Sequence, residues 1–171
     1  CLPSFDSPSV FGAILDDRKG GFFKIAATNP DVFCRQMYLP ETNVLVTRFL
    51  SPEGVGEIVD FMPVSARTNG RPDRRVVRIV RGVRGAVPFV ISCRPAFEYA
   101  TRASSLERAG EGWRWRAGET ALDLATPLDL RGEGTALRAS FTLKAGDEIP
   151  FVLRHARRDD AAPRASLEEC L

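Results

Sequence analysis

The sequence predicts an all-β protein, an antiparallel β-sandwich, and three observations support this fold class. Short runs rich in Val, Ile and Phe recur along the chain and are separated by Gly, Pro or Asn, which is typical of strands joined by turns. One of these runs alternates apolar and polar residues without interruption. No segment longer than about ten residues has a strong helical period of 3.6 residues, so a parallel sheet with crossover helices is not expected.

The alternating run covers residues 137–144 and predicts a strand with one buried face, because a strand directs successive side chains to opposite sides. Residues 145–148, Ala-Gly-Asp-Glu, predict a turn, and residues 149–155 predict the next strand. On that second strand Phe151, Leu153 and His155 are expected to share a face.

Further strands are predicted in shorter runs between turn residues. These runs cover residues 21–27, 33–39, 44–50, 57–62, 75–81, 87–93, 113–116 and 121–124. Residues 9–17 fit either a short helix or a strand. Asn69-Gly70 predicts a turn inside a polar loop over residues 65–73.

Composition limits the classes of function. The 171 residues correspond to one domain, with a core large enough to need no disulfide framework. The net charge of +2 does not by itself indicate nucleic-acid binding. No run approaches 18 apolar residues, so no membrane span is predicted. No glycine-rich phosphate-binding motif is present, and no cofactor is expected.

The numbers and positions of histidine and cysteine residues exclude further classes of metal and redox sites. The single histidine, His155, excludes a histidine-rich metal site, and no metal site is expected. The four cysteines, Cys1, Cys34, Cys93 and Cys170, are far apart and form no C-x-x-C motif, which argues against a zinc ribbon or a thioredoxin-type centre. This usage favours a reducing compartment, and a cytoplasmic location is expected. The start at Cys1 rather than Met predicts that preceding sequence, with any signal peptide, is missing.

The strand pattern and a helix-start motif near the end of the sequence divide the chain into two parts. Residues 1–156 form the predicted β-sandwich domain, and residues 157–171 form a linker followed by the first turn of a helix. Ser166 and Glu169 have the spacing of a capping box at a helix start. Leu167 and Leu171 lie four residues apart, as the first members of an apolar helical stripe. A helical domain is expected to follow, with a frayed terminal turn as the alternative.

No catalytic group stands out from the residues alone. His155 lies at a strand end beside several arginines and is interpreted as structural rather than as a general base. Adjacent acids at residues 16–17, 147–148, 159–160 and 168–169 fall at turns or near the chain end, and neighbouring residues on a strand point apart. These acids are therefore not expected to converge as a catalytic pair.

Two other clusters leave alternatives open. Seven arginines between residues 67 and 84 would suit an anion or nucleic-acid patch, but a strand would place Arg75 and Arg81 on one face and Arg78 on the other, so a solvated loop and strand edge is favoured. Trp113 and Trp115 share a strand face. Together they would form either a sugar-stacking platform or part of an ordinary core.

A series of motifs gives the chain a family resemblance over nearly its whole length. The opening Cys-Leu-Pro-Ser-Phe-Asp-Ser-Pro-Ser-Val-Phe of residues 1–11 resembles the start of bacterial glycoside hydrolase family 15 proteins, the glucoamylase-like and trehalase-like enzymes. The match continues in order with Asp-Asp and Gly-Gly-Phe-Phe, Gln-Met-Tyr-Leu-Pro and Thr-Asn-Val-Leu, Val-Asp-Phe-Met-Pro, and Pro-Ala-Phe-Glu-Tyr. The sequence is weakest in resemblance over residues 104–130. Residue 4 is Ser where many relatives carry arginine.

The resemblance implies a β-sandwich of the supersandwich type that precedes an (α/α)₆ catalytic barrel. In this family two glutamates of the barrel act as general acid and general base in hydrolysis of an α-glucosidic bond with inversion. Neither glutamate would lie in this chain, so the fragment alone is expected to be inactive. Its expected partners are its own C-terminal catalytic domain and the carbohydrate substrate of the parent enzyme. No nucleic acid or membrane is expected, and a homo-oligomer is compatible with the sequence.

Candidate substrate-binding residues are few. Phe5 and Asp6 would suit a sugar face and its hydroxyls at the border of a cleft, although Asp6-Ser7-Pro8 is also good turn chemistry. Trp113 and Trp115 are the candidates if the chain is instead a stand-alone carbohydrate-binding module. A third alternative is a basic anion- or nucleic-acid-binding β domain that uses the arginine cluster.

Overall fold

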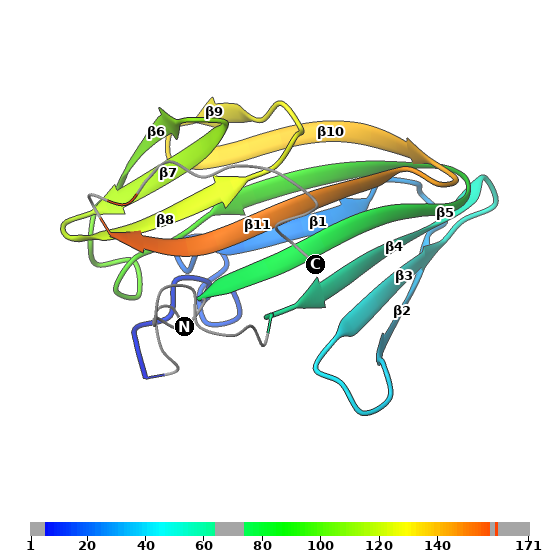
Figure 1. Ribbon diagram of the computed structural model, residues 1–171, viewed down its shortest axis with the longest axis horizontal. Coiled ribbons are helices and arrows are strands. Elements are labelled where there is room, and N and C mark those ends of the chain that lie inside the picture. The colour runs from blue at the N-terminus through cyan, green and yellow to red at the C-terminus, as the bar shows by residue number, and fades with distance from the viewer. Residues whose placement is uncertain (1–5, 64–73, 158–159, 161–171) are drawn as a thin grey trace.

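A computed structural model of the protein describes residues 6–63, 74–157 and 160 (Figure 1). This part of the chain is all-β, with eleven antiparallel strands and no helix, as the sequence predicts. The strands are β1 (Phe22–Ala27), β2 (Phe33–Tyr38), β3 (Leu45–Leu50), β4 (Gly54–Phe61), β5 (Arg75–Arg94), β6 (Ser105–Ala109), β7 (Gly112–Ala117), β8 (Thr120–Ala125), β9 (Arg131–Glu133), β10 (Ala136–Lys144) and β11 (Glu148–Arg157).

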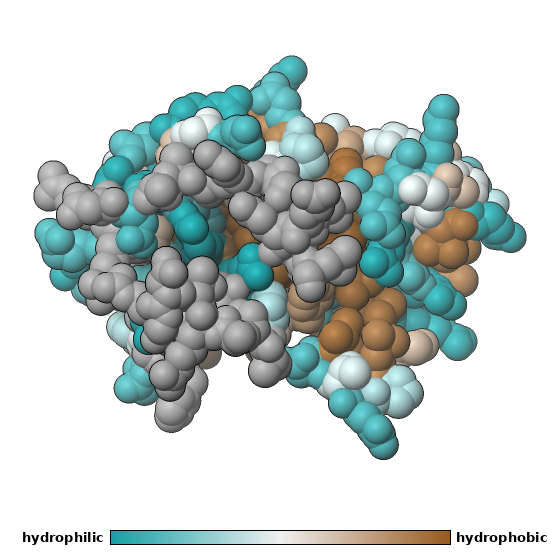
Figure 2. All heavy atoms as spheres, in the orientation of Figure 1, coloured by the Kyte–Doolittle hydropathy of each residue, from teal (hydrophilic) through white to brown (hydrophobic). Residues whose placement is uncertain are grey.

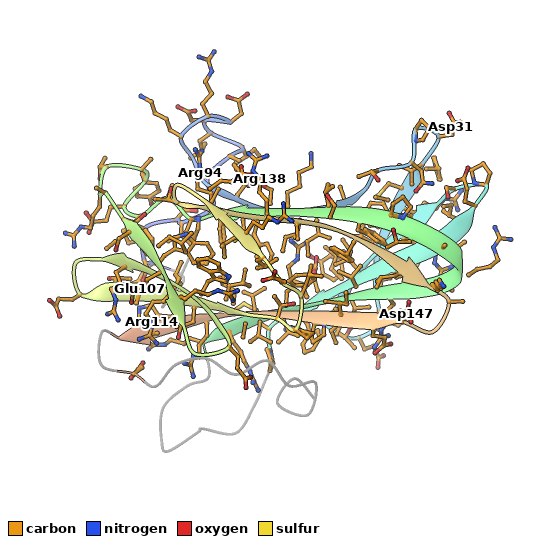
Figure 3. The ribbon with its side chains drawn as sticks, turned by 90° about the horizontal axis from the view of Figure 1, so that it is seen from above. Asp31, Arg94, Glu107, Arg114, Arg138 and Asp147 are labelled. Carbon is orange, nitrogen blue, oxygen red and sulfur yellow. The ribbon has the colours of Figure 1, made fainter. Side chains whose placement is uncertain are left out.

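The strands form two layers because β5 is twenty residues long and passes through both. The second half of β5 pairs with β1 and β10, and β10 pairs with β9, in the layer called sheet A. The first half pairs with β4 and β11 in sheet B, whose order is β2-β3-β4-β5-β11-β8-β7-β6. Figure 3 shows the two layers edge on, with side chains filling the space between them. The sandwich predicted from the sequence is confirmed.

Glycines allow β5 to cross from one layer to the other. A Cβ on Gly82 would overlap the backbone carbonyl of Lys144, and Gly85 has a φ of 63°, which favours glycine. A register shift between Val55 and Gly56 lies on the neighbouring strand at the same place. The sequence pattern predicts two separate strands here, over residues 75–81 and 87–93. That prediction was wrong because these glycines bend a strand that they do not interrupt.

The core lies between the sheets and is rich in aromatic rings. Phe49, Phe89, Phe141 and Phe151 form a chain of ring contacts from sheet B to sheet A and back, with centroid separations of 5.6, 5.7 and 6.1 Å. Full burial of side chains of this size contributes about 1.5–3 kcal/mol each. Phe151 and Leu153 are completely buried on the inner face of β11, which confirms the alternation predicted for that strand.

Other local predictions differ from the structure. Residues 9–17 form neither a helix nor a strand but a succession of turns and irregular backbone. Two strands, β6 and β9, were not predicted from the sequence. The Asn69-Gly70 turn and the helix start at Ser166 lie outside the described residues. Within the described ranges, no helix has the length and apolarity to cross a membrane.

Candidate functional site

The two tryptophans of β7 point into the space between the sheets. Trp115 is completely buried, and its indole Nε1–H donates a hydrogen bond to the backbone carbonyl of Thr135 at 2.7 Å. Trp113 is half-buried, and the guanidinium of Arg108 lies 4.6 Å from the centroid of its ring. This placement agrees with the core interpretation of the pair, since a sugar-stacking platform needs an accessible ring face. Their part in sugar binding stays a prediction.

Of the two N-terminal candidates, only Asp6 belongs to the described residues. Asp6 is exposed in a turn, and Phe5 lies outside the described residues. A few residues later, the carbonyl of Val10 accepts a hydrogen bond from the backbone N–H of Ala96 at 2.9 Å, and Val10 is buried in the core. The segment after Asp6 is therefore fixed against the loop that leaves β5.

The arginines that follow residue 73 do not form a single basic patch. Arg78 points inward, donates two hydrogen bonds to Asp60 at 2.8 and 3.0 Å, and donates a third to the backbone carbonyl of Phe23 in sheet A. Arg81 points outward and pairs with Glu148 at 2.8 Å. The opposite facing of these two arginines confirms the prediction from the sequence. Their pairing favours a structural role over an anion-binding role.

The histidine and the acidic pairs also have structural surroundings. His155 is half-buried on the inner face of β11, opposite Leu122, and its backbone N–H donates to the carbonyl of Arg74 at 3.1 Å. In the turn before β11, the Asp147 carboxylate accepts the backbone N–H of Lys144 at 2.8 Å, whereas the next residue, Glu148, pairs with Arg81. Among residues 6–63, 74–157 and 160, no group of three or more His, Cys, Asp or Glu side chains has metal-binding geometry.

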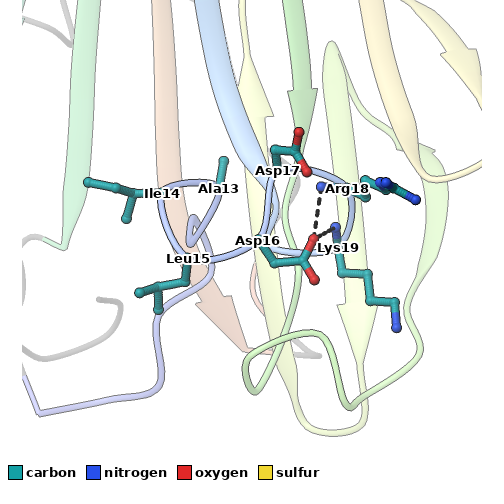
Figure 4. Close-up of a pocket in the computed structure, with 7 residues that line it drawn as sticks. All are labelled: Ala13, Ile14, Leu15, Asp16, Asp17, Arg18 and Lys19. Atoms are coloured by element: carbon teal, nitrogen blue, oxygen red, sulfur yellow. Dashed lines mark hydrogen bonds between the residues drawn. The ribbon is translucent and has the colours of Figure 1, made fainter.

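A hydrogen-bonded loop over residues 12–20 lines a shallow hollow (Figure 4). The backbone N–H of Gly12 donates to the carbonyl of Gly20 and closes the loop at its base. The Asp16 carboxylate accepts the backbone N–H groups of Lys19 and Arg18, both at 2.9 Å, and these bonds lower the pKa of Asp16 below its ordinary value. The loop displays Ile14 and Leu15, which are 96% and 79% exposed. Neither side chain carries a group that could act as an acid, a base or a nucleophile.

The outer face of sheet B has an ordered pattern of rows that run across its strands. One charged row contains Arg48, Glu57, Arg81 and Glu148 on β3, β4, β5 and β11, so its signs alternate from strand to strand. A second charged row contains Arg75, Arg154, Asp123, Arg114 and Glu107 on β5, β11, β8, β7 and β6. Cross-strand neighbours of opposite charge stabilise a sheet and fix its register.

Two apolar rows lie between the charged rows, and together they are called the apolar band. The first contains Met37, Val46, Val59, Ile79 and Pro150, and the second contains Phe61, Val77, Val152 and Ala125. Six of these side chains pack into a small cluster, joined by Val44, that is separate from the main core. Figure 2 looks onto this face and shows hydrophobic side chains over β3, β4 and β5.

The second charged row contains a buried ion pair. Arg114 donates to the two carboxylate oxygens of Asp123 at 2.6 and 2.8 Å, and both side chains are almost completely buried. Arg154 adds a contact to Asp123 at 3.0 Å. The hydrogen bonds to Asp123 raise the pKa of Arg114 above its ordinary value. Arg114 also donates to the backbone carbonyl of Asp160 at 3.1 Å, so the pair anchors the chain beyond β11.

Sequence reasoning missed the apolar band and this ion pair. A signal for the pair was present, because Asp123 stands between Leu122 and Leu124 in a run with few polar residues. An acid that interrupts such a run usually has a buried partner. The partner, Arg114, lies nine residues earlier on the preceding predicted strand.

The loop after β5 contains a strained turn. Glu98, Tyr99 and Ala100 have φ values of 49°, 54° and 67°, a left-handed conformation that costs non-glycine residues about 1–2 kcal/mol each. Thr101 donates to the Glu98 carbonyl through both its backbone N–H and its hydroxyl, and Arg102 pairs with Glu98 at 2.9 Å. The turn holds Tyr99 at the surface with 63% of its side chain exposed.

Comparisons with known proteins agree with this architecture and with the motifs. A family model described as "Trehalase-like, N-terminal" matches residues 1–169. The chain belongs to this family. A trehalase of Thermoplasma acidophilum is 35% identical and aligns with 77% of this chain and 23% of its own length. Trehalases of Mycolicibacterium smegmatis and Mycobacterium tuberculosis are 32% and 33% identical, each aligned with 87% of this chain and 25% of its own length.

The chain thus spans about a quarter of the length of these curated relatives. The trehalase-like N-terminal family is the one expected from the opening motif and from the Tyr-Leu-Pro and Thr-Asn-Val elements. In this trehalase-like domain, the ion pairs Arg78–Asp60, Arg81–Glu148 and Arg114–Asp123 link neighbouring strands, and Arg114 also anchors the chain at Asp160.

Proposed function

We propose that this chain is the non-catalytic N-terminal domain of an inverting glycoside hydrolase that acts on an α-glucoside, with trehalose as the first substrate to test. The observation that carries the proposal is the family match over residues 1–169, together with relatives named trehalase of which the chain covers about a quarter. The catalytic glutamates would then belong to a barrel that follows this domain.

The ion pairs of the described residues favour a structural, non-catalytic role for the domain. Asp60, Asp123 and Glu148 each pair with an arginine of a neighbouring strand. An inverting mechanism needs one protonated and one ionised carboxyl about 6.5–9.5 Å apart, with room for a water between them. Each of these three carboxylates is instead engaged in a cross-strand ion pair, which is a structural use of the side chain. Packing against the barrel and positioning it is the role that these features favour.

The first test is to read the coding frame beyond Leu171 and to express the whole product. Glucose release from trehalose by the full-length protein, and none by residues 1–171, is the expected result. NMR of the first product should show the anomer inverted relative to the substrate. Activity in the isolated domain, or a stop codon directly after Leu171, would contradict the proposal.

A border position at the substrate cleft is proposed for Phe5 and Asp6. An aromatic ring and a carboxylate suit a sugar face and its hydroxyl groups. Asp6→Asn in the full-length enzyme should lower kcat/KM for trehalose without lowering Tm. An exposed matched control, Asp17→Asn, should leave kcat/KM unchanged. An unchanged kcat/KM in Asp6→Asn would remove this residue from the cleft.

A further inference from the structure

The apolar band is packed like a core although it faces away from the space between the sheets. Val77 and Ile79 on β5 are 0% and 2% exposed, and Val46 and Val59 beside them are each 8% exposed. All eleven described strands belong to the two layers, and none of them lies over the band. Apolar side chains on an outer sheet face are stabilised when polypeptide covers them, because this removes them from water.

The chain leaves the sandwich beside this surface. The Arg114 side chain, on the outer face of β7, holds the carbonyl of Asp160 at 3.1 Å. From β7 to β5 the distance across sheet B is three strand spacings, or about 14 Å. Five residues, 161–165, can span up to about 17 Å. Residue 166 is therefore within reach of the part of the band formed by Val77 and Val152.

The sequence after Asp160 contains apolar and acidic residues that are complementary to this surface. Leu167 and Leu171, which lie outside the described residues, are spaced as an apolar helical stripe. Such a stripe suits packing on an apolar surface. Glu168 and Glu169 lie between them. The adjacent charged row contains three arginines against two acids, so its excess charge is complementary to this acidic pair.

We propose that the apolar band is the docking surface for the polypeptide that follows Asp160, with Leu167 and Leu171 seated over Val77 and Val152. Arg114 and Asp123 set the point at which this segment enters the face. The inference rests on the proposed function in that the docked segment would lead into the catalytic barrel. Its orientation on sheet B would then fix how the barrel is presented.

A double-mutant cycle in the 171-residue chain tests the contact directly. Leu167→Ala, Val152→Ala and the double variant are compared with the parent chain by urea unfolding. Leu167→Ala alone should raise the unfolding equilibrium constant by about tenfold or more. In the Val152→Ala background the same change should have an effect about threefold smaller, because the partner side chain is already truncated. Leu167→Ala removes three side-chain carbons and Val152→Ala removes two, so the sandwich should still fold.

The matched control is Leu15→Ala, which removes an exposed leucine in the loop over residues 12–20. It should change the unfolding constant by less than about twofold and combine additively with Val152→Ala. A Leu167→Ala variant that behaves like this control would overturn the proposal. So would a dimeric chain, seen by sedimentation, that Val152→Asp converts to monomer, because a second copy would then cover the band. Neither readout uses activity, so failure of trehalose hydrolysis would leave this test intact.

Discussion

Arg114 on β7 and Asp123 on β8 lie directly opposite each other and form a two-bond ion pair that is buried on the outer face of sheet B, with contact distances of 2.6 and 2.8 Å. Burial of such a pair gives little net stability, because the desolvation of both charges offsets their attraction. Its value to this domain lies in position, since Arg114 also holds the backbone at Asp160.

Removal of the acid should destabilise the domain strongly. Asp123→Ala leaves Arg114 buried without its carboxylate, which costs about 3–5 kcal/mol in comparable buried pairs. Urea unfolding at neutral pH measures the loss. Asp129→Ala is the matched control, because Asp129 pairs with Arg108 at the exposed surface and such pairs contribute about 0–1 kcal/mol. Equal losses in the two variants would contradict the structural reading of Asp123.

The two tryptophans of β7 should respond differently to substitution by phenylalanine. Trp115→Phe removes a hydrogen bond and leaves the Thr135 carbonyl without its indole donor, which should cost about 1–3 kcal/mol beyond the loss of ring volume. The buried Nε1 of Trp113 has no such bond, so Trp113→Phe should cost less. Thermal unfolding of the two variants provides the comparison. A larger loss for Trp113→Phe would show that its indole N–H is bonded in solution.

The strained turn offers a stabilising substitution. Ala100→Gly should raise the free energy of unfolding by up to about 1 kcal/mol, because glycine adopts the left-handed φ of 67° without steric cost. Ala139→Gly on β10 is the control, since glycine within a strand should cost about 0.5–1 kcal/mol. Chemical denaturation gives both values, and a destabilised Ala100→Gly would refute the strain.

The loop over residues 12–20 should weaken in acid. Hydrogen bonds from Lys19 and Arg18 lower the pKa of Asp16 in the folded state, so the carboxylate stabilises the fold above its unfolded pKa of about 4. This contribution disappears as the pH falls through the lower folded pKa. Asp16→Asn should therefore lose less stability than the parent as the pH falls below about 4. Denaturation at a series of pH values tests this prediction, and an acid dependence that is unchanged in Asp16→Asn would contradict it.

Much of the fold could be predicted from single residues and short patterns. Strand β10 was placed to within one residue because Leu137, Ala139, Phe141 and Leu143 face the core at every second position. Strand β9 was not predicted, because its three residues, Arg-Gly-Glu, show no alternation of apolar and polar side chains. The continuity of β5 was not predicted, because Gly82 and Gly85 resemble strand ends when only the local sequence is considered. Glycine is required at residue 82 by the close approach of Lys144, which is distant in the sequence.

The candidate site was less predictable for the same physical reason. The family could be inferred from contiguous motifs such as residues 1–11. The rows on sheet B are formed by residues that meet only through strand register, such as Val59 opposite Ile79 and Arg154 opposite Asp123. No short window of sequence contains those pairs.

The shared strand β5 has a consequence for synthesis of the protein. Its partners β1 and β4 precede it, but β10 and β11 begin only at Ala136 and Glu148. During translation, each half of β5 therefore has one unpaired edge until β10 and β11, which come late in the domain, have left the ribosome. Unpaired edges in such long-range sheets are sites of slow folding and aggregation. Pairing of β10 and β11 with the two halves of β5 is then the step that closes the domain.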